Sequence, residues 1–103
     1  MKGKLVRDRI PDIIEANDKR KPRTKKLSPK AFKFELRKKL LEEASEAVRA
    51  KTPKVLAEEL ADVEEVVNAL CKVYNIKRST VTKIQKSKRA KRGGFAKRVF
   101  LIN

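Results

Sequence analysis

The amino-acid sequence predicts an all-α fold in which two long helices form an antiparallel hairpin within a small helical bundle. Two residue pairs place the starts of these helices: Ser28-Pro29 and Thr52-Pro53 each join a hydroxyl N-cap to a proline in the first helical turn. The apolar residues that follow each start recur every three or four positions, which is the period of a helix. We therefore expect helices from residue 29 to about residue 50 and from residue 53 to about residue 75.

The chain before these helices is predicted to be mostly irregular. Residues 4–17 are expected to form a lead-in followed by one or two helical turns, with Pro11 in the first turn. Residues 18–30 contain helix-breaking residues and are expected to form a loop, in which residues 25–27 could be a short extended piece.

The chain after the hairpin is predicted to contain a third helix and an apolar tail. Ser79 is expected to cap a helix that runs from Thr80 to about Lys91, and Gly93-Gly94 would end it. Residues 99–102 (VFLI) are apolar, and we expect a short strand there that completes a terminal strand pair.

The composition predicts one domain, residues 1–103, that assembles as a homo-oligomer. Only 40% of the 103 residues are apolar, and a domain this small buries a limited fraction of its surface. No apolar run is long enough to span a membrane, and residues 1–14 lack the apolar stretch of a secretory signal, so we expect a cytoplasmic protein with no membrane partner. Because Cys71 is the single cysteine and histidine is absent, an internal disulfide and structural zinc are excluded.

The net charge of +16 predicts a polyanionic partner, and the distribution of the charge is more informative than its sum. Residues 19–39 carry eleven Lys or Arg and one acid, and residues 71–103 carry eleven Lys or Arg and no acid. Residues 40–70 carry eight acids and three bases. This acidic centre between basic flanks suits a metal-bound polyphosphate, whereas a protein that only binds nucleic acid does not need it.

Four carboxylates lie on or beside the apolar faces of the two long helices. On helical wheels centred on Leu40 and Leu56, Glu43 and Glu59 fall at about 300°, and Glu46 and Asp62 fall at about 240°. Such positions are costly for a carboxylate that has neither a counter-charge nor a metal ion. Three acids of these helices lie near the opposite side instead: Glu42, Glu58 and Glu65.

The same four carboxylates are symmetric about the predicted turn. If the helices are antiparallel, Glu46 faces Glu59 and Glu43 faces Asp62, so that all four converge. A site made only of carboxylate oxygens selects a hard divalent cation, and we expect Mg²⁺ with Mn²⁺ as the alternative. The alternative to a metal site is an exposed acidic stripe whose carboxylates pair locally with lysines.

These residues form a pattern that resembles a known family. Glu43-x-x-Glu46, twelve residues, then Glu59-x-x-Asp62 is similar to the metal motif of the all-α nucleoside triphosphate pyrophosphohydrolases, the MazG-like superfamily. Four further segments look like a small branch related to phosphoribosyl-ATP pyrophosphohydrolase, whose members are described as house-cleaning enzymes: residues 4–14 (KLVRDRIPDII), 41–43 (LEE), 58–63 (EELADV) and 91–95 (KRGGF).

The resemblance implies a magnesium-dependent hydrolase that cleaves a nucleoside triphosphate to monophosphate and pyrophosphate. The metal ligands would be Glu43, Glu46, Glu59 and Asp62. The general base would be a carboxylate or the metal hydroxide itself, and the carboxylate would be Glu42 or Glu43, between which the sequence does not decide. The basic segment that would bind phosphate is Lys91, Arg92, Gly93 and Gly94, since the glycines allow a backbone to approach an anion. Arg7 and Arg9 are expected either to contact substrate or to form surface salt bridges. The family implies a dimer or a tetramer.

Two other functions are compatible with the sequence. A basic nucleic-acid-binding helical protein without catalysis would explain the lysine and arginine runs, although five aromatic residues offer few stacking platforms. A purely structural helical oligomer would explain the apolar stripes. A heat-adapted host is a further explanation of the high lysine content.

Overall fold

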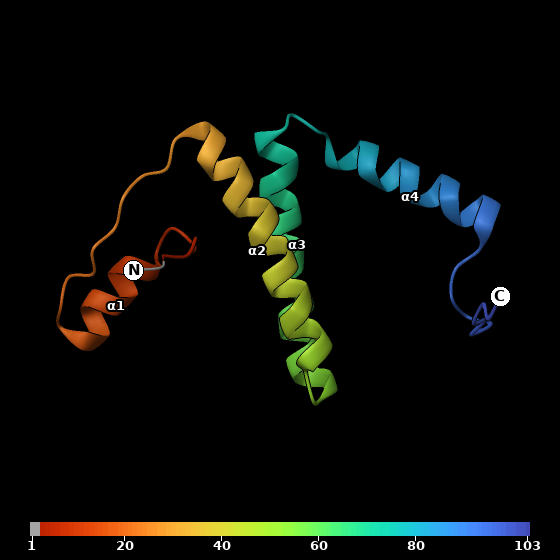
Figure 1. Ribbon diagram of the computed structural model, residues 1–103, viewed down its shortest axis with the longest axis horizontal. Coiled ribbons are helices and arrows are strands. Elements are labelled where there is room, and N and C mark those ends of the chain that lie inside the picture. The colour runs from red at the N-terminus through yellow and green to blue at the C-terminus, as the bar shows by residue number, and fades with distance from the viewer. Residues whose placement is uncertain (1–2) are drawn as a thin grey trace.

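The structure, a computed structural model, describes residues 3–103, and these residues form four helices and no strand (Figure 1). The all-α class predicted from the sequence is therefore confirmed. The helices are α1 (Ile10–Asp18), α2 (Pro29–Arg49), α3 (Pro53–Val73) and α4 (Arg78–Arg92). None of the helices in this range has the length and apolar content that crossing a bilayer requires.

The two long helices begin where the sequence predicts. The Ser28 hydroxyl accepts a hydrogen bond from the Ala31 N–H at 3.2 Å, and the Thr52 hydroxyl accepts one from the Val55 N–H at 3.2 Å. Each hydroxyl thus satisfies one of the N–H groups that a helix start leaves without an intrahelical partner. Both helices end within two residues of the predicted positions, at Arg49 and Val73.

Helix α4 starts earlier than predicted, and Ser79 is not its N-cap. The N-cap is Lys77, whose side chain makes no capping hydrogen bond. Its carbonyl accepts from the Thr80 N–H at 2.9 Å, so the first turn closes on Lys77 and Ser79 already lies inside the helix. The predicted end is confirmed: Gly93 has a φ of 80°, which glycine adopts without a steric penalty, and its N–H donates to the Arg89 carbonyl at 2.8 Å.

The predicted terminal strand pair is wrong. Neither residues 25–27 nor residues 99–102 form a strand, because neither segment has a neighbouring strand to bond with in the described part of the chain. The side chains of the tail are almost fully open to solvent, and Phe100 is 87% exposed.

Only α2 and α3 pack extensively against each other within residues 3–103. Three residues, 50–52, connect them, and Figure 1 shows the chain turning back there so that α3 lies beside α2. Helices α1 and α4 extend away from this pair on opposite sides (Figure 1). The radius of gyration is 17.5 Å, well above the value of about 13 Å for a compact domain of this length. The described chain therefore does not close into the small bundle that the sequence predicts.

The apolar core is small because each long helix has one neighbour. The buried apolar side chains are Leu36 on α2 and Val66 and Cys71 on α3. Leu60 and Val48 belong to the predicted apolar stripes but are 50% and 85% exposed. A single neighbour covers one stripe of a helix, so the rest of a wide apolar face stays open to solvent.

We expect Thr52→Ala to destabilise the chain by about 1 kcal/mol, because the N-cap of α3 is lost at the point where the chain turns between the long helices. Urea unfolding followed by circular dichroism measures this change. Thr52→Ser keeps the capping oxygen and should retain nearly all of the stability. Equal stability of Thr52→Ala and the wild type would show that the cap does not hold this turn.

Candidate metal centre

Three glutamates from the two long helices meet in space. Glu43 and Glu46 lie on α2, Glu59 lies on α3, and each offers a carboxylate oxygen within 4.8 Å of the other two. Glu43 and Glu46 share a face of α2 because they are three residues apart. The oxygens are therefore nearly as close together as ligands around a hard divalent cation, whose bonds to oxygen are about 2.0–2.6 Å long.

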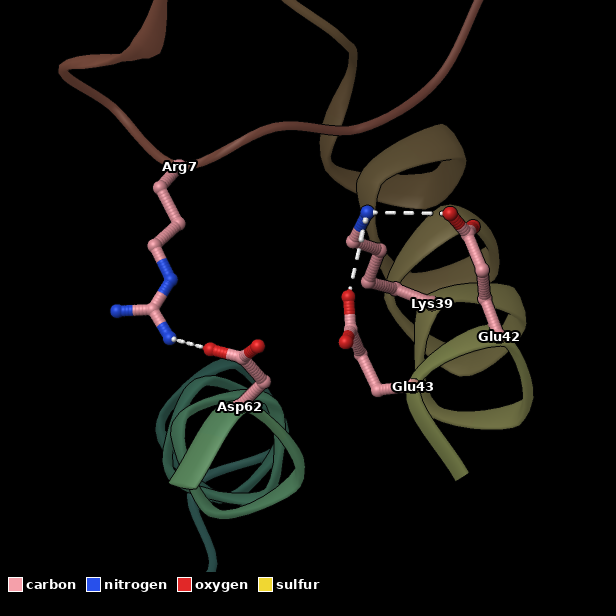
Figure 2. A network of polar contacts seen from close by, with 5 residues as sticks. All are labelled: Arg7, Lys39, Glu42, Glu43 and Asp62. Carbon is pink, nitrogen blue, oxygen red and sulfur yellow. Dashed lines mark hydrogen bonds and ion pairs between the residues drawn. The ribbon is translucent and has the colours of Figure 1, made fainter. Parts of the chain in front are cut away.

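Glu43 is the buried member of the group, with 8% of its surface exposed, as its place in the apolar arc of the helix predicts. Burial raises the pKa of the Glu43 carboxyl, and the charges of Glu46 and Asp62 raise it further. The Lys39 ammonium acts in the opposite direction. Its Nζ lies 3.6 Å from Glu43 Oε1 and 3.4 Å from Glu42 Oε1 (Figure 2).

Glu59 completes the group from α3. Loss of hydration raises the pKa of the Glu59 carboxyl, and the charges of Glu46, Asp62 and Glu58 add to this effect, while Arg49 opposes it. Ionisation of Glu43 and of Glu59 is thus unfavourable beside the charges of the neighbouring carboxylates. The arrangement favours either a bound proton or a cation among the carboxylates.

Asp62, the fourth predicted ligand, does not belong to the close group. Its Oδ1 accepts a hydrogen bond from Arg7 Nη2 at 2.6 Å, and Figure 2 shows the arginine reaching α3 from the N-terminal segment. The two side chains are 58% and 42% exposed, so the ion pair itself adds little stability. Its effect on the site is to attach residues 3–9 beside the carboxylates.

The other predicted site residues lie in different places. Glu42 is exposed and bonded to Lys39. Arg9 is the N-cap residue of α1 and is exposed. The segment Lys91–Gly94 lies at the end of α4, and Arg92, Gly93 and Gly94 line a separate groove of about 610 Å³ there. No carboxylate lines that groove.

A shallow groove of about 370 Å³ opens beside two of the three glutamates. Its lining residues are Glu46, Arg49, Ala50, Lys51, Val55 and Glu59. The groove thus places two cationic side chains next to two carboxylates at the turn between the long helices. A ligand in it would meet both signs of charge, as a phosphate group with a divalent cation requires.

Three basic residues of the site were not among the predicted ones: Lys39, Arg49 and Lys51. Sequence spacing could have indicated the first two, since Lys39 is four residues before Glu43 and Arg49 is three residues after Glu46. Lys39 partly compensates the negative charge of Glu43 from the preceding turn of the helix. It does not take the place of a metal ion shared by the three glutamates, because it contacts only Glu42 and Glu43.

Comparison of the chain with known protein families, with curated proteins and with solved structures found no match.

The raised pKa values predict how stability depends on pH. The ordinary pKa of a glutamate is 4.5, and Glu43 and Glu59 hold their protons to higher pH in the folded chain. Without a divalent cation, the folded state therefore binds more protons than the unfolded state above pH 4.5, and stability falls as pH rises through the raised values. We expect the Tm in EDTA to fall over this range.

The variant Glu43→Gln isolates this effect, because the glutamine amide does not titrate. As pH rises, the Tm of this variant should fall less steeply than the Tm of the wild type. The matched control is Glu65→Gln, an exposed position of α3 that should follow the wild type. Parallel curves of Tm against pH for Glu43→Gln and the wild type would contradict a raised pKa at Glu43.

Proposed function

We propose that this protein is a magnesium-dependent nucleoside triphosphate pyrophosphohydrolase, which releases a nucleoside monophosphate and pyrophosphate in a house-cleaning role. The observation that carries the proposal is the convergence of Glu43, Glu46 and Glu59 from two helices, with two of the three carboxyls disfavoured as bare anions. The sequence resemblance also favours it, because the same three glutamates belong to the pattern that is similar to the metal motif of that family.

In this proposal α2 and α3 act as an antiparallel hairpin whose facing carboxylates hold the cation. Asp62 would complete the set once it exchanges Arg7 for the cation. Arg7 would then be free to bind a phosphate oxygen with two hydrogen bonds, which the guanidinium geometry favours. The pair in the structure thus holds both groups beside the site until substrate and metal arrive.

Bound Mg²⁺ or Mn²⁺ would neutralise phosphate charge and lower the pKa of a water molecule at the site. Since histidine is absent, the general base would be a carboxylate, unless the attacking group is the metal hydroxide itself. We favour Glu43 over Glu42, because Glu43 belongs to the close group of carboxylates whereas Glu42 is exposed outside it. Lys39 supports the proposal by positioning both candidates.

The proposal includes assembly into a dimer or a tetramer. Phe34, Leu41 and Val48 are 62%, 71% and 85% exposed and recur at seven-residue intervals on α2, which suits packing against another helix. In one chain Lys91–Gly94 lies apart from the carboxylates. Phosphate binding by this segment therefore requires the segment of a second copy.

The direct test measures pyrophosphate release from a panel of normal and modified nucleoside triphosphates with Mg²⁺. We expect Glu59→Gln to lower turnover by on the order of 100-fold or more, since even residues that only support a ligand matter at the 10–100-fold level. Glu65→Gln, on the same helix but outside the group, should retain wild-type turnover. Wild-type turnover by Glu59→Gln would overturn the metal assignment.

Binding of the cation can be tested without catalysis. A ligand that binds only the folded state stabilises it by RT ln(1 + [L]/Kd), so we expect Mg²⁺ or Mn²⁺ to raise the Tm of the wild type. Glu46→Gln should lose most of this shift, and Glu65→Gln should keep it. Absence of any shift in the wild type would favour a structural helical oligomer whose acidic group holds no ion.

A further inference from the structure

Helix α4 carries a row of cations at three-residue intervals. Lys83, Lys86, Arg89 and Arg92 lie along it, and all four residues are exposed. Each step of three residues turns by about 300°, so the row winds gradually round the helix and forms one of the ridges that helices present to a partner. No acidic residue occurs between residue 71 and residue 103.

This row has an electrostatic cost within the isolated helix. Like charges on neighbouring turns of a helix repel one another and destabilise it. Arg89 and Arg92 gain something back because they lie in the last turn, where the helix dipole favours cations. Lys83 and Lys86 lie before that turn. In residues 3–103 no ion pair involves any of the four.

The helix is attached at its start and open along the rest of its length. Arg78 Nη2 lies 3.1 Å from Glu64 Oε1, which links the first residue of α4 to α3. Beyond this pair α4 extends away from α2 and α3 (Figure 1). The groove at its far end is lined by Gln85, Lys88, Arg89, Arg92, Gly93, Gly94 and Phe95.

We propose that α4 binds the phosphate backbone of double-stranded DNA through this row, without reading sequence. A helix of 15 residues is about 22 Å long and, with side chains, about 10–12 Å wide. The major groove of B-DNA is about 12 Å wide and admits it, with phosphates on both edges, whereas the major groove of duplex RNA is too narrow.

Other polyanions fit α4 less well. Proteins that bind single strands use several aromatic side chains as stacking platforms, whereas residues 78–92 contain none and Phe95 is the one aromatic residue that lines the groove at the end of α4. A helix that lies on an anionic membrane needs a broad apolar face, whereas the apolar residues of α4 are Val81, Ile84 and Ala90. The inference does not use the carboxylate group, and Arg92 is the one residue of the row that the hydrolase proposal also uses.

The test is the salt dependence of binding to a fluorescent duplex of mixed sequence in EDTA, measured by anisotropy. Four phosphate contacts predict a slope of log K against log [salt] of about −3.6. In the triple variant Lys83→Gln, Lys86→Gln, Arg89→Gln the slope should be smaller in magnitude by about 2.7, and binding should be at least tenfold weaker at about 50 mM salt. Glutamine preserves helix propensity, and circular dichroism checks that α4 remains folded.

The matched control removes the same charge from the loop between α1 and α2: Lys21→Gln, Lys25→Gln, Lys26→Gln. It should bind duplex DNA within about twofold of the wild type. Equal losses in both triple variants would show that binding follows total charge, and the proposal would fail. A charge-preserving variant, Lys83→Arg with Lys86→Arg, should bind as the wild type does. It shows whether the loss of binding at these positions comes from loss of charge and not from misfolding. Binding to anionic vesicles and to single-stranded RNA is measured in the same way. The proposal would also fail if either bound as tightly as the duplex and lost as much affinity in the α4 triple variant.

Discussion

The packing of α2 against α3 determines where the candidate site residues lie. Leu36 on α2 and Val66 and Cys71 on α3 are the buried apolar side chains, and their burial holds the two helices side by side. The carboxylates of Glu43, Glu46 and Glu59 are brought together as a consequence of that packing. Hydrophobic burial therefore works against the electrostatic repulsion that it creates. With so few buried apolar residues, this balance leaves the long helices sensitive to the charge between them.

The cations nearest to the site reduce that repulsion without removing it. Lys39 contacts Glu43 from the preceding turn of α2, and Arg7 reaches Asp62 from the N-terminal segment (Figure 2). The pKa values of Glu43 and Glu59 nevertheless remain raised. This partly compensated charge is what the proposed magnesium chemistry would use, since a cation would relieve the remaining repulsion.

The acidic side chains are concentrated away from the basic helix α4, so the chain has a group of carboxylates and a separate basic surface. The acids lie mainly on the two long helices, whereas α4 is entirely basic in its charged residues and is attached to α3 through one end. A cationic helix held away from the carboxylates avoids neutralising them. Its charged side chains remain exposed along the helix.

The sequence by itself determined the helices, because their signals are local. Ser28 and Thr52 satisfy N–H groups three residues away, Gly93 supplies the positive φ at the end of α4, and the wheel position of Glu43 predicts its burial. Ser79 failed as a cap because Lys77 closes the first turn through its backbone carbonyl, which any residue provides. The i, i+4 relation of Lys39 to Glu43 was also readable from spacing alone.

Only the tertiary structure decided which predicted partners meet. Three carboxylates converge, Asp62 bonds to Arg7 across 55 positions of sequence, and Lys91–Gly94 lies in a groove of its own. The predicted strands and the wider bundle did not form in the described chain, because a strand requires a partner and a bundle requires apolar faces that cover one another. Periodicity states which face of a helix is apolar, but the surface that covers this face depends on contacts between residues far apart in the sequence.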